Sequence, residues 1–129
     1  MKLIYVASPY AGDIEKNTEF AKDACRHVMN EGHAFFAPHL LNPSILDDSK
    51  PEERQLGIDM GLAMLEHCDE LWCYGERISH GMMLEIEEAG RLGIPTRRVL
   101  AQENGFAIGK VKSNQQAEAP AMAMAVGMV

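Results

Sequence analysis

The sequence has few cysteines, few basic residues and no long hydrophobic run. Its 129 residues include only three cysteines, which form no C-x-x-C pair, so we expect reduced thiols and a cytoplasmic protein. No apolar stretch approaches the ~20 residues of a membrane-spanning helix, and Ser8-Pro9 ends the first apolar run too early for a signal peptide. The 12 basic against 19 acidic residues, a net charge of -7, argue against binding to nucleic acid polymers.

Several cofactor and metal motifs are missing as well. The sequence contains neither the G-x-G-x-x-G pattern of dinucleotide-binding folds nor the G-x-x-x-x-G-K-[ST] pattern of phosphate-binding loops. It also lacks H-E-x-x-H, and the spacing of His67, Cys68 and Cys73 matches no recognised zinc pattern. We therefore expect a protein that uses no metal and no cofactor.

The beginning of the chain has the pattern of a β-α-β unit. Residues 3–7 form a continuous apolar run, typical of a central strand buried on both faces, and residues 33–37 form a second strand. Between them Asp13 is placed to cap a helix that ends near Gly32. Its predicted apolar face consists of Ala21, Ala24, Cys25, Val28 and Met29. A helix that crosses between two strands makes those strands parallel.

Residues 38–50 have the composition of a long polar loop, and such loops are often functional in compact domains. Ser49 and Glu52 have the S-x-x-E spacing of a capping box, and Pro51 suits the first turn of a helix. These signals predict a helix over residues 51–67.

Strands and helices continue to alternate along the chain. We expect a strand over residues 71–74, a helix over 82–92, a strand over 96–100, and either a hairpin or a fifth strand over 105–111. The pattern predicts an α/β fold: a mostly parallel, doubly wound sheet of four or five strands with helices on both faces. A chain of this length has room for one such core.

The end of the chain differs in composition from the rest. Residues 113–129 are rich in Ala, Met and Gln and carry no charge after Glu118. We predict one domain over residues 1–112, followed by a tail that is flexible or contacts another subunit. Because a domain of this size often shares its site with a second copy, we expect a homodimer or a larger homo-oligomer.

Three loops follow strands of the predicted sheet, where ligands of open parallel sheets bind. The loops are Ser8-Pro9-Tyr10-Ala11-Gly12, Pro38-His39 and Ile78-Ser79-His80-Gly81. The third loop leads into a helix N-terminus, whose free N–H groups favour an anion, and Ser79 adds a hydroxyl donor. The sequence therefore predicts a ligand site at this edge of the sheet.

The helix that follows Gly81 contains three acidic residues in different orientations. Glu85 lies about 70° from the centre of the apolar stripe, whereas Glu87 and Glu88 lie about 130° away from it. The stripe consists of Met82, Ile86, Ala89 and Gly93. We expect Glu85 to be partly buried and to face the cleft, where a carboxylate can act as nucleophile or base. The alternative is a solvated acid that complements the helix dipole.

Three sequence motifs occur in an order and at a spacing that are typical of one superfamily. They are Ile4-Tyr5-Val6-Ala7-Ser8-Pro9-Tyr10, Cys68-Asp69-Glu70-Leu71-Trp72, and Ser79-x-Gly81-x-x-x-Glu85-x-x-x-Ala89 with Leu92-Gly93-Ile94-Pro95. Together they resemble the nucleoside 2-deoxyribosyltransferase superfamily, which includes deoxynucleoside 5′-monophosphate N-glycosidases. The run from Ala37 to Arg54 is most similar to small uncharacterised bacterial and phage relatives. The resemblance implies a flavodoxin-like doubly wound sheet.

The resemblance also implies an activity and roles for individual residues. Members of the superfamily cleave or transfer at the N-glycosidic bond of a (deoxy)nucleoside or its 5′-monophosphate. Glu85 takes the place of the glutamate that attacks C1′ and forms a glycosyl-enzyme intermediate. Ser79 and Gly81 match a serine and a glycine that bind the 5′-phosphate, which favours a nucleotide substrate. Tyr10 matches a first-loop position near the sugar or base, with Ser8 and Pro9 beside it.

The second acidic residue of the superfamily has no clear counterpart. Counting back eight positions from Asp69 reaches Gly61, and Asp59 can serve as the second catalytic acid only if the helix is shifted. A non-catalytic nucleotide-binding module, or a sensor of a signal nucleotide, is therefore an alternative to an enzyme.

Three other residues of the predicted site have structural alternatives. His39 touches a base or a phosphate, or is an ordinary loop histidine. His80 becomes charged near a phosphate at lower pH, or stays solvated. Met82 lines the pocket, or packs in the core.

Overall fold

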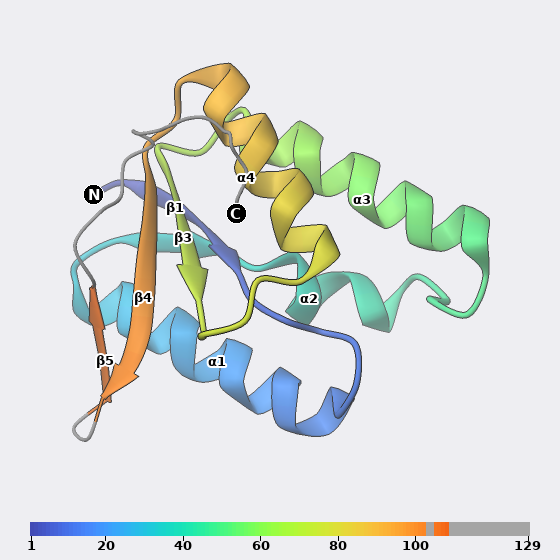
Figure 1. Cartoon of the computed structure of the whole chain (residues 1–129), viewed down its shortest axis with the longest axis horizontal. Coiled ribbons are helices and arrows are strands. Elements are labelled where there is room, and N and C mark those ends of the chain that lie inside the picture. Colours follow the sequence, from blue (N-terminus) through green and yellow to red (C-terminus); the bar gives the residue numbers. More distant parts are fainter. Residues whose placement is uncertain (103–104, 109–129) are drawn as a thin grey trace.

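A five-stranded sheet in the order β2-β1-β3-β4-β5 forms the centre of the computed structural model, which describes residues 1–102 and 105–108 (Figure 1). The first four strands are parallel, and β5 pairs antiparallel with β4. The strands are β1 (Leu3–Ala7), β2 (Ala34–Phe36), β3 (Glu70–Tyr74), β4 (Thr96–Gln102) and β5 (Gly105–Ile108).

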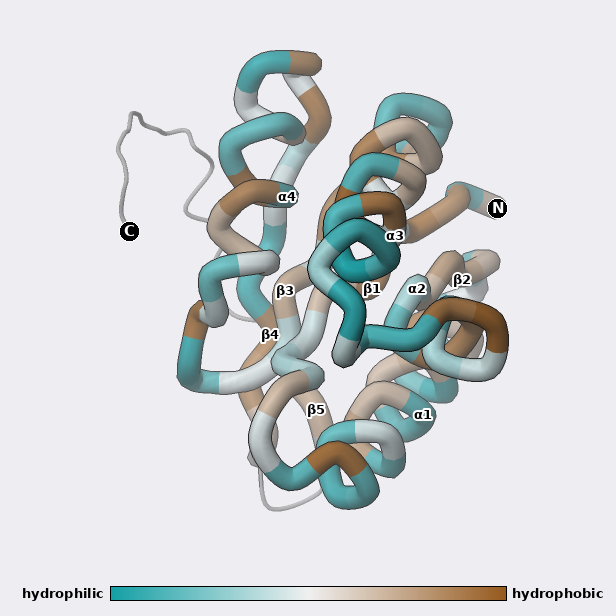
Figure 2. The backbone as a smooth tube through the Cα atoms, turned by 90° about the vertical axis from the view of Figure 1, so that its right-hand side faces the viewer, coloured by the Kyte–Doolittle hydropathy of each residue, from teal (hydrophilic) through white to brown (hydrophobic). Residues whose placement is uncertain are grey.

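Helices cover both faces of this sheet, as Figures 1 and 2 show. α1 (Ile14–Asn30) lies on one face, and α3 (Pro51–Leu65) and α4 (His80–Leu92) lie next to each other on the other. The core under α1 includes Ile4, Val6, Ala24, Cys25, Val28, Trp72, Tyr74 and Val99. The core under α3 and α4 includes Tyr5, Ala7, Leu65, Leu71, Cys73, Met82 and Ala89. The structure thus confirms the α/β, mostly parallel, doubly wound architecture.

The two cores explain the unbroken apolar run of β1. Alternate residues of a strand point to opposite faces, so Ile4 and Val6 enter one core while Tyr5 and Ala7 enter the other. Burying both faces removes all four side chains from water, and the predicted central strand is confirmed.

The helix between β1 and β2 begins as predicted but buries a narrower face. Asp13 is its N-cap, and its carboxylate accepts a hydrogen bond from the Lys16 N–H. Four of the five predicted apolar residues are buried, but Met29 is 51% exposed. Met29 lies about 100° around the helix from the buried Val28 and so turns away from the sheet.

The predicted long loop at residues 38–50 is wrong in part. A short helix, α2 (Pro38–Leu41), and a 3-10 turn, η1 (Asn42–Ser44), occupy its first half. Pro38 supplies the first position of α2, where its missing N–H costs nothing. The segment packs against α1, and it forms one wall of the pocket.

The predicted capping box of α3 is also wrong. The N-cap of α3 is Lys50, which makes no side-chain cap. The Ser49 hydroxyl instead donates to the Asp47 carboxylate at 2.6 Å, because the two residues form a local turn. α3 begins at Pro51 as predicted, but it ends at Leu65, two residues before the predicted end.

α4 begins two residues earlier than the apolar periodicity indicates. Ser79 is its N-cap and accepts a hydrogen bond from the Met82 N–H at 3.2 Å, so His80 and Gly81 form the first turn. Gly93 ends the helix in the left-handed conformation, with φ of 74°.

The last described segment combines the two alternatives predicted for residues 105–111. β5 is a fifth strand, and its antiparallel pairing with β4 also makes it the second arm of a hairpin. Phe106 packs edge-on against Tyr74 with 5.1 Å between the ring centroids. The predicted boundary at residue 112 and the tail over 113–129 lie outside the described residues.

The three cysteines, Cys25, Cys68 and Cys73, are free and buried. No helix within residues 1–102 and 105–108 is long and apolar enough to cross a membrane.

Candidate active site

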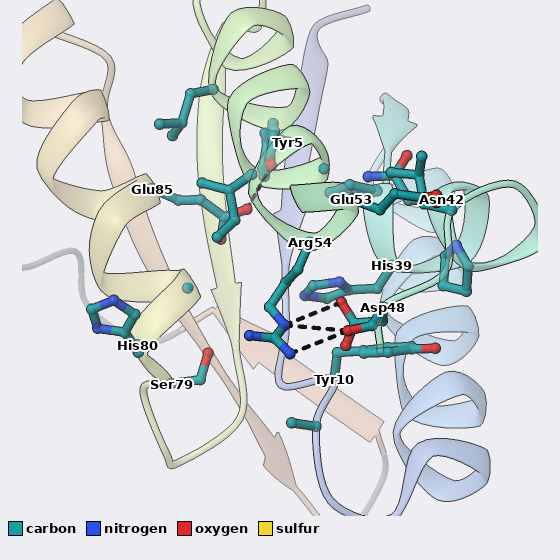
Figure 3. Close-up of a pocket in the computed structure, with 18 of the residues that line it drawn as sticks. Tyr5, Tyr10, His39, Asn42, Asp48, Glu53, Arg54, Ser79, His80 and Glu85 are labelled. Atoms are coloured by element: carbon teal, nitrogen blue, oxygen red, sulfur yellow. Dashed lines mark hydrogen bonds and ion pairs between the residues drawn. The ribbon is translucent and has the colours of Figure 1, made fainter. Parts of the chain in front are cut away.

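A pocket of about 330 Å³ opens at the carboxyl ends of the first strands, where the sequence predicts a ligand site. Figure 3 shows side chains from three walls that converge on it. Six predicted site residues line it: Tyr10, His39, Ser79, His80, Gly81 and Glu85. The structure thus brings together residues from three loops that lie far apart in the chain.

Four other predicted residues do not line the pocket. Ser8 is buried at the end of β1, and Pro9 is half-buried in the loop behind it. Met82 is fully buried in the core under α4, which fits its structural alternative. Asp59 is exposed on α3 and accepts a hydrogen bond from Gln55. Asp59 cannot face the pocket because it lies two residues, about 200°, from Gly61, which does face the sheet.

Glu85 lies at the back of the pocket with one free oxygen. Its residue is only 9% exposed, and its Oε2 accepts a hydrogen bond of 2.5 Å from the Tyr5 hydroxyl. Its Oε1 is buried and has no hydrogen-bond partner among the described residues. Because Glu85 lines the pocket, this unpartnered oxygen is the candidate contact for a ligand.

Burial also changes the protonation of this pair. Loss of solvation raises the pKa of Glu85 to about 7, although the hydrogen bond from Tyr5 acts in the opposite direction. Burial and the nearby Glu85 carboxylate raise the pKa of Tyr5, so its hydroxyl stays protonated and donates. At neutral pH, Glu85 is therefore divided between its ionised and protonated forms.

Gly61 allows this pair to form. A Cβ atom at Gly61 would lie 2.7 Å from the Tyr5 hydroxyl oxygen, which is closer than a Cβ atom approaches any neighbour. The hydroxyl therefore fills the space next to the position where the superfamily's second acid is expected. Tyr5 was predicted only as a core residue, but a buried tyrosine needs a partner for its hydroxyl, and this signal could have identified it.

Tyr10 and His39 form an aromatic shelf on another side of the pocket. Their rings stack with a centroid distance of 5.2 Å and an interplanar angle of 25°. Burial lowers the pKa of His39, although contacts with the Ser8 backbone and Asp48 oppose this shift. His39 is therefore neutral at pH 7 and offers a flat, uncharged face.

An arginine crosses the pocket opening from α3. The Arg54 guanidinium donates to the Asp48 carbonyl oxygen at 3.2 and 3.3 Å and lies 3.8 Å from its carboxylate. This wall, which residues 42–58 build, was not predicted, because the sequence indicated only a long polar loop over residues 38–50 and a helix from Pro51. The S-x-x-E signal pointed to the helix start alone.

The N-terminus of α4 forms the side of the pocket opposite residues 42–58. The Ser79 oxygen accepts from the Met82 N–H, so its own proton is free to donate to a ligand. Nothing lies within 4 Å of the place that a Cβ of Gly81 would take, so the backbone is open to a ligand there. Arg77 and His80 add positive or titratable groups nearby. This arrangement suits an anion such as a phosphate.

The chemistry of the described site is that of a buried carboxylate next to a phenol. No three His, Cys, Asp or Glu side chains in the described part of the chain are grouped so that they could hold a metal ion.

Known proteins with a similar fold were found among solved structures. A 2-deoxyribosyltransferase from Bacillus psychrosaccharolyticus aligns with a TM-score of 0.62 and 20% identity over 76% of this chain and 72% of its own. A 2-deoxyribosyltransferase from Leishmania mexicana aligns with a TM-score of 0.53 and 15% identity over 94% of this chain and 88% of its own. At these identities the likeness shows the fold.

Among curated proteins, none matches the chain. One family model matches residues 2–99, which span the first three strands, the start of β4 and the pocket. The chain therefore belongs to the family described as a domain of unknown function, DUF7768.

Proposed function

We propose that the chain cleaves or transfers at the N-glycosidic bond of a (deoxy)nucleoside or its 5′-monophosphate, with Glu85 as nucleophile. One observation carries this proposal: Glu85 lines the pocket with its Oε1 buried and unpartnered, while Tyr5 holds Oε2. The fold shared with the two 2-deoxyribosyltransferases supports it.

The reaction would proceed in two steps at one carbon. Glu85 Oε1 attacks C1′, the bond from C1′ to the base nitrogen breaks, and its electron pair leaves with the base, which takes up a proton from solvent. Water or a second base then attacks C1′ and gives a proton back to solvent, the ester bond to Glu85 breaks, and the carboxylate is restored. Tyr5 fixes the carboxylate in one orientation, so no freedom of Glu85 has to be lost at the moment of attack.

The N-terminus of α4 would hold the 5′-phosphate in this proposal. Ser79 donates its free proton, Gly81 lets the phosphate approach the backbone, and His80 lies beside them. One helix N-terminus can bind one phosphate without a basic patch, so the net charge of -7 is no obstacle. The shelf of Tyr10 and His39 would contact the sugar or the base.

A nucleotide-binding module without activity is the second candidate. The glycine at position 61 favours it, because the Tyr5 hydroxyl lies beside the space that a second acid would need. Such a protein would use the same pocket to sense a nucleotide. The predicted homo-oligomer and cytoplasmic location stay predictions for either function.

Base release from a panel of nucleosides and their 5′-monophosphates separates the two candidates. We expect release by the wild type and loss of at least ~1,000-fold in Glu85→Gln, which keeps the shape and the Tyr5 contact but is no nucleophile. Glu87→Gln is the matched control, because Glu87 lies on the same helix and is exposed. Thermal stabilisation by a nucleotide without any turnover would favour the binding module.

A further inference from the structure

We infer that the wall opposite α4 binds a nucleobase that carries an exocyclic amino group next to a ring nitrogen, as adenine and cytosine do. Asn42 and Glu53 would read these two positions. The inference rests on the proposed function, since it deepens the substrate class of the same pocket. It concerns residues that neither the sequence analysis nor the similarity to known folds assigned.

The placement of the base follows from the two fixed points of the substrate. Glu85 must face C1′, and the N-terminus of α4 suits the phosphate on C5′. In a β-nucleotide the base on C1′ and the C5′ group on C4′ project from the same face of the sugar but from opposite ends of its C1′–O4′–C4′ edge. With the phosphate at α4, the base therefore extends toward residues 42–58. Figure 3 shows Asn42 and Glu53 on the side of the pocket away from Ser79 and His80.

This wall combines apolar side chains with the polar groups of Asn42, Asp48, Glu53 and Arg54, a mixture that suits the flat face and the polar edge of a base. Its apolar lining consists of Pro43, Leu46, Ile58 and Leu62. Gly57 makes the surface flat: a Cβ there would lie 3.3 Å from Leu46 Cδ1 and 3.6 Å from Asn42 Nδ2. The Asn42 amide thus lies directly above Gly57, at the edge of a flat apolar patch.

The Asn42 amide is free to bind a ligand. The residue is half-buried, and no described residue makes a hydrogen bond with its side chain. An amide offers both a donor and an acceptor, so it can bind a ring nitrogen and an adjacent amino group. Asn42 by itself therefore does not distinguish one base from another.

Glu53 supplies the discrimination. It lies one helical turn before Gly57, and its Oε1 accepts a hydrogen bond of 2.7 Å from the Asp47 N–H. This contact fixes the carboxylate and leaves Oε2 for the pocket, which Glu53 lines. An ionised carboxylate only accepts hydrogen bonds. It pairs with an amino group, but the carbonyl oxygen of uracil, thymine or hypoxanthine would face it with no proton between them.

Substrate pairs that differ only in this group test the inference. The pairs are 2′-deoxyadenosine against 2′-deoxyinosine and 2′-deoxycytidine against 2′-deoxyuridine, each as nucleoside and as 5′-monophosphate. We expect kcat/KM to be at least ~10-fold higher for the amino member of each pair, because a site built for a hydrogen bond rejects the analogue that lacks it.

Glu53→Gln is the decisive variant because its oxygen can keep the Asp47 contact while its NH₂ group faces the pocket. We expect it to remove or reverse the preference, with at least ~10-fold change in the ratio of kcat/KM values. Glu52→Gln, an exposed change in the same turn, should leave the ratio unchanged. Asn42→Ala should lower kcat/KM for both members, and unchanged melting temperatures would show that each variant folds.

The failure of this inference differs from the failure of the proposed function. Base release at equal kcat/KM within each pair, or a preference that Glu53→Gln leaves intact, overturns the inference alone. No release from any substrate overturns the proposed function. The dissociation constants of the same monophosphate pairs, measured by calorimetry on wild type and Glu53→Gln, then decide the inference separately.

Discussion

The Tyr5 hydroxyl donates a hydrogen bond of 2.5 Å to Glu85 Oε2 across 80 residues of sequence. The bond joins β1 to α4 inside the core, and it leaves Glu85 Oε1 as the free oxygen of the pocket. Tyr5 therefore fixes one carboxylate oxygen of Glu85 and leaves the other to contact a ligand.

Removing the Tyr5 hydroxyl should change the pH profile as well as the rate. Because the hydrogen bond lowers the pKa of Glu85 against the effect of burial, Tyr5→Phe should raise that pKa above about 7. Glu85 must be ionised to attack, so the rising limb of kcat/KM against pH should move to higher pH. Tyr74→Phe is the control, since it removes a buried hydroxyl that bonds to His27 on the other face of the sheet. A limb that stays in place in Tyr5→Phe would contradict the role of the hydroxyl.

The raised pKa of Glu85 predicts a specific dependence of stability on pH. Its folded-state value of about 7 lies above its ordinary value of 4.5, so the folded protein holds the proton more tightly. The contribution of Glu85 to the free energy of unfolding is fully present below pH 4.5. It is lost as the pH rises to about 7, and the total loss is about 3 kcal/mol. Glu85→Gln cannot ionise, so the difference in unfolding free energy between variant and wild type should grow in its favour across this window. Urea unfolding at a series of pH values measures it, and a constant difference would contradict the prediction.

A methyl group at Gly61, on α3, should disturb the hydrogen bond between Tyr5 and Glu85. The added Cβ would lie 2.7 Å from the Tyr5 oxygen, so Gly61→Ala should displace Tyr5 and lower activity by ~10-fold or more. Gly90→Ala serves as the matched control, because Gly90 is an exposed helix position with nothing within 4 Å. The free energy of unfolding of Gly90→Ala should rise by roughly 0.5–1 kcal/mol, because alanine has a higher helix propensity than glycine. A Gly61→Ala protein with unchanged activity and a similar gain would show that the close approach is unimportant.

Two roles of Ser79, its N-cap of α4 and its proposed contact with a phosphate, can be tested separately. Ser79→Asp keeps an N-cap acceptor for the Met82 N–H, so stability should hold, whereas Ser79→Ala should lose about 1 kcal/mol. The new carboxylate would repel a phosphate, so Ser79→Asp should raise KM for 5′-monophosphates by ~10-fold or more and leave free nucleosides unaffected. Equal effects on nucleosides and monophosphates would remove the phosphate role from this helix end.

Local patterns predicted much of the fold because they arise from neighbouring residues. Each of these patterns is specified by a few residues that are close in the sequence. Examples are the apolar run of β1, the N-cap at Asp13 and the glycines that end two helices. The orientation of Glu85 followed from helical periodicity in the same way, and the residue is buried as expected. The missing capping box of α3 shows the limit of such signals, since the Ser49 hydroxyl bonds to Asp47 and not to the helix.

The sequence by itself therefore determined the order of the strands and of the three long helices, and the face of α4 that carries Glu85. Only the tertiary structure decided what surrounds Glu85: the hydroxyl of Tyr5, the close approach of Gly61 to that hydroxyl, and a pocket whose other wall is built by residues 42–58. It also placed Asp59 outside the pocket. The physical reason is that periodicity and capping act over a few residues. Contacts between β1, α3 and α4 depend on how three elements pack, and no local pattern records that packing.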